Sequence, residues 1–408
     1  MSIVNSKSSG SNYRWYVLSL AALTFTFTFA TQQICMTVLF NEIAEDLGLS
    51  LVEVGVVWGV PSLAALFIVF IGGLLADRYG AKRVMGIACL LAGLAGAMRG
   101  IAGDFTSLAL VTFFFGISVW VIPANVIKTI ATWFSGRQLV VANGVVAAGM
   151  GFGFTVGAMI SATILSPLLG GWENVLFLYG AISIIIGLLW LLTVRWPEQP
   201  GSAGSEGDVP LRQVISHVFS TKAIWLLGLT LFGYIGCIQG MVGYLPLYLR
   251  EIGWTATSAD GTLAAFNGVS TLGAIPLALL ANRLGLRKVV LFPVLLITIV
   301  GVALLPVVDN AMVWVLMIMV GIARDGFMAI SFTMSIETEG IGVLYAGTAV
   351  GLVQTIFNVG PVISPPLGNS LAETNPGFPF FLWAAFGLLA LVAFCFVKET
   401  GRRQHPQL

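Results

Sequence analysis

The sequence GGLLADRYGAKRV, from Gly72 to Val84, recurs 205 residues later as LALLANRLGLRKV, from Leu277 to Val289. Each copy follows an apolar run and supplies an Asp or Asn, an Arg, a glycine and a basic pair in the same register. Gly80 and Gly285 suit a tight reversal, and the basic residues suit a loop held at one face of a membrane. A repeat at the same place in each half indicates an internal duplication.

The runs around both copies are almost wholly apolar. Hydrophobic residues make up 58% of the 408 residues and charged residues only 9%, whereas an ordinary soluble chain carries about 25% charged residues. A bilayer core needs about 20 apolar residues per helix, and irregular backbone cannot face lipid because its polar groups would be unpaired. The runs are continuous rather than alternating, which excludes membrane strands. The composition therefore predicts an all-α membrane protein.

The apolar runs predict twelve transmembrane helices, arranged as two six-helix bundles related by a pseudo-two-fold axis. Residues 1–195 form the predicted N-terminal bundle, 196–221 a linker rich in Pro, Gly, Ser and acid, and 222–408 the C-terminal bundle. The first run is too long for a signal peptide and is predicted to be a retained helix. The approximate limits are 14–40, 51–76, 84–102, 106–132, 138–166, 172–194, 222–249, 257–281, 287–306, 311–336, 342–371 and 378–397.

The basic residues predict the orientation of these helices. If the N-terminus is cytoplasmic, fifteen of the nineteen Lys and Arg fall on the cytoplasmic side, and only Arg99 and Arg250 fall outside. Lys128 and Arg324 lie within spans. This asymmetry predicts cytoplasmic N- and C-termini in a multi-pass protein. A compact chain of this kind fits a prokaryotic cytoplasmic (inner) membrane.

The repeated loop resembles a known signature. GLLADRYGAKR, from Gly73 to Arg83, is similar to the sequence between helices two and three of the major facilitator superfamily, and LLANRLGLRK, from Leu279 to Lys288, resembles its weaker second copy. The resemblance implies two rigid bundles around a central cavity that opens to one side at a time. It also implies a gating role for the loops, although the alternative that they only fix topology stays open. The implied gating residues are Gly73, Asp77, Arg78, Gly80, Arg83, Asn282, Arg283 and Gly285.

The chain departs from two patterns of that superfamily. Proton-coupled members resemble one another in an Arg four residues before a helix-four Gly, but here Thr112 precedes Gly116. Antiport-type members carry a Pro in helix five where this chain has Phe154. Multidrug or amphipathic-compound efflux therefore loses support, yet it remains an alternative because aromatic residues could line a greasy pocket.

Arg324 and Asp325 lie about halfway along the predicted tenth span, where charge is hardest to keep. Consecutive helical residues point about 100° apart, so we expect the two side chains not to pair with each other. A guanidinium is a rigid fork of donors suited to an oxyanion, and an Asp in low dielectric can take and release protons near neutral pH. The hypothesis is that Arg324 binds an anionic substrate while Asp325 carries the coupled proton or releases Arg324 when protonated.

Other polar residues lie inside the spans that line the cavity in the superfamily's layout. For each, the alternative of helix packing or interhelical hydrogen bonding stays open, and Lys128 could also extend to headgroups at the membrane surface. The predicted substrate-binding residues besides Arg324 are Lys128, Gln32, Gln33, Trp58, Asn125, Tyr234, Gln239, Asn267, Gln354 and Asn358.

These observations predict a secondary active transporter that moves a small, carboxylate-type anion by alternating access. Coupling to protons, as in a symporter, is part of this hypothesis. A non-transporting receptor of the same architecture is the alternative from another class. No His, Cys, Ser or paired-carboxylate cluster has the spacing of nucleophilic or metal chemistry, so we expect no enzyme, no catalytic residue, no cofactor and no metal. The expected partners are a small-molecule substrate and membrane lipid, with no nucleic acid, and the expected state is a monomer.

Overall fold

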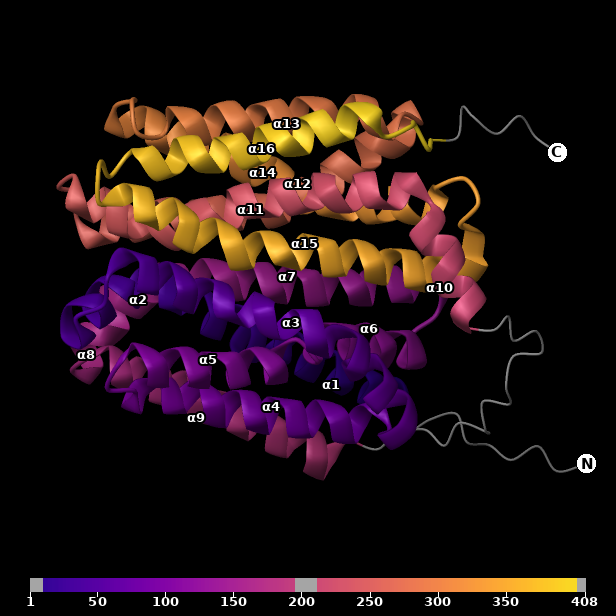
Figure 1. Cartoon of the computed structure of the whole chain (residues 1–408). Helices are drawn as coiled ribbons and strands as arrows, with labels where there is room; N and C mark the ends of the chain where they lie inside the picture. The colour runs from indigo at the N-terminus through magenta and orange to yellow at the C-terminus, as the bar shows by residue number, and fades with distance from the viewer. Residues whose placement is uncertain (1–9, 195–210, 402–408) are drawn as a thin grey trace, which may run out of the picture. The chain divides into compact units, whose positions relative to one another are not determined.

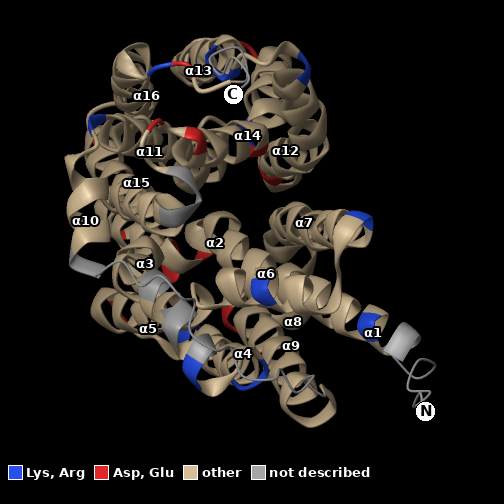
Figure 2. Ribbon diagram, turned by 90° about the vertical axis from the view of Figure 1, so that its right-hand side faces the viewer, with Lys and Arg blue, Asp and Glu red and all other residues tan. Residues whose placement is uncertain are grey.

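The computed structural model shown in Figure 1 consists mainly of long helices. It describes residues 10–194 and 211–401, except for the side chains of 10–12, 69–70, 72–74, 76–77, 211–212 and 342–344. Within this part of the chain, twelve helices are long and apolar enough to cross a membrane, which confirms the predicted number and the all-α class. Figure 2 shows how few positions on these helices carry Lys, Arg, Asp or Glu.

The first six spans agree with their predicted limits to within a few residues, except that the first continues to Leu47. Their elements are α1 (Gly10–Leu23), the π-helix η1 (Thr24–Thr31), α2 (Gln32–Leu47), α3 (Leu51–Tyr79), α4 (Ala81–Met98), the 3₁₀ turn η2 (Arg99–Ile101), α5 (Phe105–Val119), α6 (Ile122–Trp133), α7 (Gly136–Ile160), the π-helix η3 (Ser161–Leu165), α8 (Ser166–Leu169) and α9 (Trp172–Thr193).

The last six spans also agree with the prediction. Their elements, with one further helix before them, are α10 (Leu211–Ser220), α11 (Lys222–Glu251), α12 (Ala256–Leu284), α13 (Arg287–Leu304), α14 (Asn310–Glu337), α15 (Gly342–Ala372) and α16 (Phe378–Phe396).

Helix α10 lies inside residues 196–221, the segment predicted as a cytoplasmic linker. Its buried Val218 and half-buried Val214 lie on one side of the helix, so an amphipathic pattern overrides the polar composition of the linker. His217 stacks on Tyr345, with ring centroids 4.4 Å apart, and its Nε2 lies 2.7 Å from the Gly340 carbonyl. Residues 195–210 of the predicted linker lie outside the described part of the chain.

Three spans are interrupted where a continuous helix was expected. The fourth span breaks between α5 and α6, where Pro123 opens α6 because proline has no N–H to donate to the preceding turn. The first and fifth spans each contain a π-helical segment, η1 and η3. Such wider turns leave carbonyl groups without their usual intrahelical donors, and they occur often at functional sites.

The helices form two compact units. One contains Met1–Leu39 with Phe67–Trp196, and the other contains Phe40–Leu66 with Pro197–Leu408. The second unit therefore includes the end of α2 and the first part of α3 as well as α10 to α16.

Small residues let the helices of the first unit approach closely. A Cβ on Gly93 of α4 would lie 2.7 Å from the Gly180 carbonyl of α9, and a Cβ on Gly180 would lie 2.6 Å from the Gly93 carbonyl. The π-helix η1 packs on α7 in a related way, since the Thr26 hydroxyl donates to the Gly149 carbonyl at 2.8 Å. In lipid, such contacts replace the hydrophobic driving force that holds soluble helices together.

The second unit is held by close packing of α11, α12, α14 and α15. The start of α3 joins it, because the Trp58 indole donates to the Gln239 carbonyl of α11 and Asn369 of α15 donates to the Leu51 carbonyl, both at 2.8 Å. Gly321 of α14 lies against the backbone of Phe266 in α12, where a Cβ would come within 2.6 Å of the Phe266 carbonyl. This last contact brings α12 beside the middle of α14.

We predict that Gly93→Ala lowers the thermal midpoint of the detergent-purified protein by several degrees, because the added methyl group overpacks the α4–α9 contact at a cost of about 1–3 kcal/mol. Gly144→Ala is the matched control, since nothing lies within 4 Å of a Cβ at Gly144. Thermal unfolding followed by size-exclusion chromatography measures both. Equal midpoints for the two variants would contradict close packing at Gly93.

Candidate functional site

The two charges in the middle of α14 pair with each other. Arg324 Nε donates to Asp325 Oδ1 at 2.9 Å, and the side chains are 15% and 25% exposed. The expectation that they point apart and do not pair is therefore wrong. A helical projection describes Cβ directions, but the long guanidinium arm bends back to its neighbour. The contact makes the site electrically neutral as a whole, which lowers the cost of placing charge at this depth.

Helix α12 supplies the other contacts of Arg324. Its Nη1 donates to Asn267 Oδ1 at 2.9 Å, and its guanidinium carbon lies 5.1 Å from the centroid of the Phe266 ring. Asn267 is buried, and its own Nδ2 donates to the Leu263 carbonyl at 2.9 Å, which fixes the amide orientation. The carboxylate, the amide and the aromatic ring together hold the guanidinium in one place.

Helix α11 contributes Tyr234 to the site formed by α14 and α12. It is fully buried and stacks on Phe327, one turn along α14 from the charged pair, with ring centroids 4.0 Å apart. It also lies within electrostatic range of Arg324 and Asp325. Four predicted site residues, namely Arg324, Asp325, Asn267 and Tyr234, thus come together in the second unit.

The remaining predicted residues of the second unit have packing contacts of their own. Trp58 is buried against Gly243 and bonds the backbone of Gln239, as described above. On α15, Asn358 is buried and its amide donates to the Gln354 carbonyl at 2.8 Å. These contacts favour the packing alternative for Trp58 and Asn358, and they leave the role of the Gln239 and Gln354 side chains a prediction.

Some of the predicted residues of the first unit also have hydrogen bonds to neighbouring groups, and one has none to a described residue. Gln32 is fully buried, and its amide nitrogen donates to the Tyr179 carbonyl at 3.3 Å and to the Ser183 hydroxyl. Asn125 is buried and donates to the Val121 carbonyl at 2.8 Å, and Lys128 is half-buried on α6. Gln33 is also buried, but its side chain has no hydrogen bond to a residue that the structure describes.

Arg99, which the sequence analysis counted on the non-cytoplasmic side, is a buried charge, and the sequence analysis did not predict its burial. Its side chain is 1% exposed, and its Nη2 donates to the carbonyl of Gln32 at 3.2 Å and to Gln32 Oε1 at 3.3 Å. The guanidinium carbon lies 4.1 Å from the centroid of Phe115. Among the described residues no carboxylate pairs with it, so an aromatic face and carbonyl oxygens hold this charge. The end of η1 beside Gln32 is thereby fixed.

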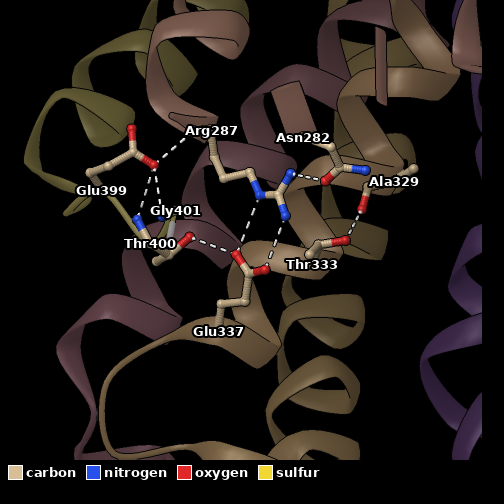
Figure 3. Close-up of polar contacts among 8 residues, drawn as sticks. All are labelled: Asn282, Arg287, Ala329, Thr333, Glu337, Glu399, Thr400 and Gly401. Carbon is tan, nitrogen blue, oxygen red and sulfur yellow. Dashed lines mark hydrogen bonds and ion pairs between the residues drawn. The ribbon is translucent and has the colours of Figure 1, made fainter. Parts of the chain in front are cut away.

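A polar network occupies the second copy of the repeated loop (Figure 3). Arg287 donates to both oxygens of Glu337, from Nε at 3.4 Å and from Nη2 at 3.1 Å, and to Asn282 Oδ1 at 2.6 Å. Gly285 has φ +63°, the left-handed conformation that ends α12. Arg283 is exposed. Asn282 and Gly285 thus have structural roles in this loop, and their gating role stays a prediction.

The segment after α16 completes this network. Glu399 accepts from the Arg287 and Lys288 backbone N–H groups at 2.7 and 2.9 Å, which are the first two of α13. It also accepts from the Thr400 and Gly401 N–H groups at 3.1 and 3.0 Å (Figure 3). A carboxylate at the start of a helix bonds donors that have no intrahelical partner and opposes the helix dipole. Glu399 therefore fixes the chain end on the loop.

The first copy of the loop has fewer contacts. Gly80 has φ +83°, so only glycine fits the reversal without strain. Arg78 is exposed with its guanidinium 5.6 Å from the Tyr79 ring centroid, and Arg83 is exposed. Gly73 and the side chain of Asp77 lie outside the described residues, so their gating role stays a prediction.

Sequence reasoning missed Arg99, Glu337 and Glu399. Glu337 and Glu399 were detectable, because each is an acid at the end of an apolar span on a side dominated by basic residues. Arg99 carried no such signal, since it lies beside a predicted loop and its partners are on other helices.

The sequence profile of the Major Facilitator Superfamily matches residues 20–340 and 264–407, and the chain belongs to that superfamily. It is therefore a multi-pass membrane transporter rather than an enzyme. The predicted membership of this superfamily is confirmed.

Several relatives of the chain are named as transporters of organic acids. The chain is 28% identical over 244 residues to the 3-(3-hydroxy-phenyl)propionate transporter of Escherichia coli strain K12, an alignment that spans 59% of each protein. It is 23% identical over 457 aligned positions to a probable galactarate/D-glucarate transporter of the same strain, covering 99% of both. A gallate transporter of Pseudomonas putida is 24% identical, over 97% of this chain and 93% of that one.

Solved structures show the same fold. A bacterial homolog of the human lysosomal transporter Spinster, in an inward-facing and occupied conformation, superposes with a TM-score of 0.78 at 17% identity and covers 95% of this chain and 97% of that one. A mutant of the nucleoside transporter NupG gives a TM-score of 0.78 at 16% identity, with 93% and 99% covered.

We predict that Glu399→Ala destabilises the protein by about 1–2 kcal/mol, as the loss of a helix N-cap does, because four backbone N–H groups lose their acceptor. Thermal unfolding in detergent measures the loss. Glu373→Ala is the control, since Glu373 is exposed. A midpoint for Glu399→Ala equal to that of the control would show that the terminal segment does not stabilise the loop.

The pair Gln32→Ala and Gln33→Ala separates packing from ligand roles in the first span. We expect Gln32→Ala to lower the thermal midpoint, because Arg99 and Ser183 lose partners in a buried site where an unpaired group costs about 1–3 kcal/mol. Gln33→Ala should leave the midpoint unchanged. The interpretation of Gln32 as a packing residue fails if the two variants unfold at the same temperature.

Proposed function

We propose that this transporter moves small carboxylate anions together with protons across a prokaryotic cytoplasmic membrane, with Arg324 as the anion-binding residue. The observation that carries the proposal is the Arg324 guanidinium, which is only partly exposed, lies mid-span, and is held by Asp325 and Asn267. The orientation with both termini cytoplasmic and the monomeric state belong to the same proposal.

The charge balance of this site favours a proton as the coupled ion. Arg324 and Asp325 together are neutral, so a bound carboxylate would leave the site with a net negative charge in low dielectric. Protonation of Asp325 restores neutrality and frees the Nε donor that it now occupies. The substrate carboxylate then takes the place of the Asp325 carboxylate on the guanidinium. One proton enters for each carboxylate bound.

The surrounding groups suit this exchange. Asn267 holds Nη1 whether or not Asp325 is charged, so the guanidinium keeps its position while one acceptor replaces the other. Tyr234 and Phe266 supply aromatic surface near the charges. Relatives named for galactarate, 3-(3-hydroxy-phenyl)propionate and gallate support a carboxylate substrate, since each of those solutes carries that group.

The test is transport of labelled galactarate, gallate and 3-(3-hydroxyphenyl)propionate into proteoliposomes. Wild-type protein should exchange at least one of them and accumulate it when the outside is acidic. Asp325→Asn should keep exchange and lose acid-driven accumulation, because it imitates the protonated state permanently. Arg324→Lys should raise the KM by roughly tenfold, since a point charge replaces a fork of donors.

Glu373→Gln, an exposed acid-to-amide change, is the control for Asp325→Asn. The anion proposal is wrong if the wild-type protein exchanges none of these carboxylates. The coupling proposal alone is wrong if Asp325→Asn still accumulates substrate in response to an acidic exterior.

A further inference from the structure

The two copies of the repeated loop differ in how their cations are partnered. In the second copy, Arg287 pairs with Glu337, and Lys288 Nζ donates to the Cys395 and Val397 carbonyls at 2.7 and 2.9 Å. The equivalent residues of the first copy, at the constant offset of 205, are Lys82 and Arg83. Neither forms an ion pair or side-chain hydrogen bond within the described residues.

The first N–H groups of the helix that follows the first loop also have no side-chain acceptor among the described residues. In the second copy, Glu399 bonds the first two N–H groups of α13. Helix α4 begins after Gly80 with no side-chain cap, and its first-turn residues include Lys82 and Arg83 but no acid. Its free N–H groups and the two cations therefore create positive potential at one place.

The sequence explains the missing acids. The last helices of the two units end before Val194 and Val397, both with extended backbone, and the chain then reads VRW in the first half and VKE in the second. Trp196 stands in sequence where Glu399 stands. The residue 205 positions before Glu337 is Thr132, so the second acid is absent as well.

A cavity of about 590 Å³ lies at this position in the first unit. It is lined by Tyr79, Gly80, Lys82 and Arg83 of the loop and the start of α4, by Leu191 and Leu192 of α9, and by Val194 directly after α9. No acidic side chain among the described residues lines it. In the second unit a carboxylate of the chain itself meets the corresponding basic residues.

We propose that this cavity binds the phosphate headgroup of an anionic phospholipid. The phosphate oxygens accept from Lys82, Arg83 and the first N–H groups of α4, as the Glu399 carboxylate accepts from α13 in the other unit.

Apolar surface beside the cavity suits acyl chains, which a free phosphate lacks. Leu192 is 78% exposed at the cavity wall, and exposed Leu188 and Ile185 continue along α9 away from it. Exposed Ile87 and Leu91 continue along α4, which packs against α9. The ligand therefore has a charged head at the helix ends and apolar chains along the two helices. The proposal does not depend on the transported solute.

The test uses the full-length protein in neutral detergent, with bound lipid counted by native mass spectrometry. Wild-type protein should retain phosphatidylglycerol in preference to phosphatidylcholine. Lys82→Gln with Arg83→Gln should raise the half-saturating concentration of phosphatidylglycerol by roughly tenfold or more, because two cations near the headgroup are lost.

The matched control is Arg137→Gln with Lys222→Gln, which removes the same charge from two exposed positions outside the cavity. It should bind as the wild type does. The charge-preserving pair Lys82→Arg with Arg83→Lys should also keep binding, which separates the role of charge from an effect on folding.

Three results would overturn the proposal. The neutralised pair could retain phosphatidylglycerol as the control does, or phosphatidylcholine could bind equally well. Inorganic phosphate at the same phosphate concentration could displace the lipid, which would assign the cavity to a free anion instead.

Discussion

Hydrocarbon cannot solvate an ion, so each charged side chain inside a span must lie beside its own partner. Arg324 uses the adjacent Asp325, Arg250 uses the fully buried Asp260, both of whose oxygens lie 2.7 Å from Arg250 Nη2, and Arg99 uses carbonyl oxygens with the face of Phe115. These three solutions place helices: Arg250 joins the ends of α11 and α12, and Arg99 joins spans one, three and four. Within each unit, these neutralising contacts help to set which helices lie side by side.

The partner of Arg324 lies on the same helix, which restricts how the site can change. A pair that bridges two helices breaks when those helices separate, but Arg324 and Asp325 move together in any rigid motion of α14. A change in their contact must then come from chemistry at the site, either a proton on the carboxylate or a competing anion on the guanidinium. Asn267 belongs to α12, which packs tightly on α14 through Gly321, so it moves with them.

The sequence predicts the architecture well because the signals for it are long. Twelve apolar runs and a thirteen-position repeat each sum over many residues, and single errors do not change them. The misses concern single side chains or short segments. Arg99 depends on Gln32 and Phe115, which are distant in sequence, and the pairing within α14 depends on the reach of one flexible side chain. The π-helical segments depend on which neighbouring groups bond to a few backbone carbonyls. Helix α10 depends on which residues cover Val214 and Val218.

The duplicated loops show that repetition preserves shape more faithfully than charge. Gly80 and Gly285 both have positive φ, and the basic pair follows each in register, so the backbone reversal is common to the two units. Among the described residues, acids that neutralise it are found in the second unit, where Glu337 is the last residue of α14 and Glu399 follows α16. In that loop, the Arg287 side chain and the first N–H groups of α13 bond to carboxylates of the chain itself. In the first loop, Lys82 and Arg83 have no ion pair or side-chain hydrogen bond with a described residue, and this difference between the loops is the basis of the proposed phospholipid site.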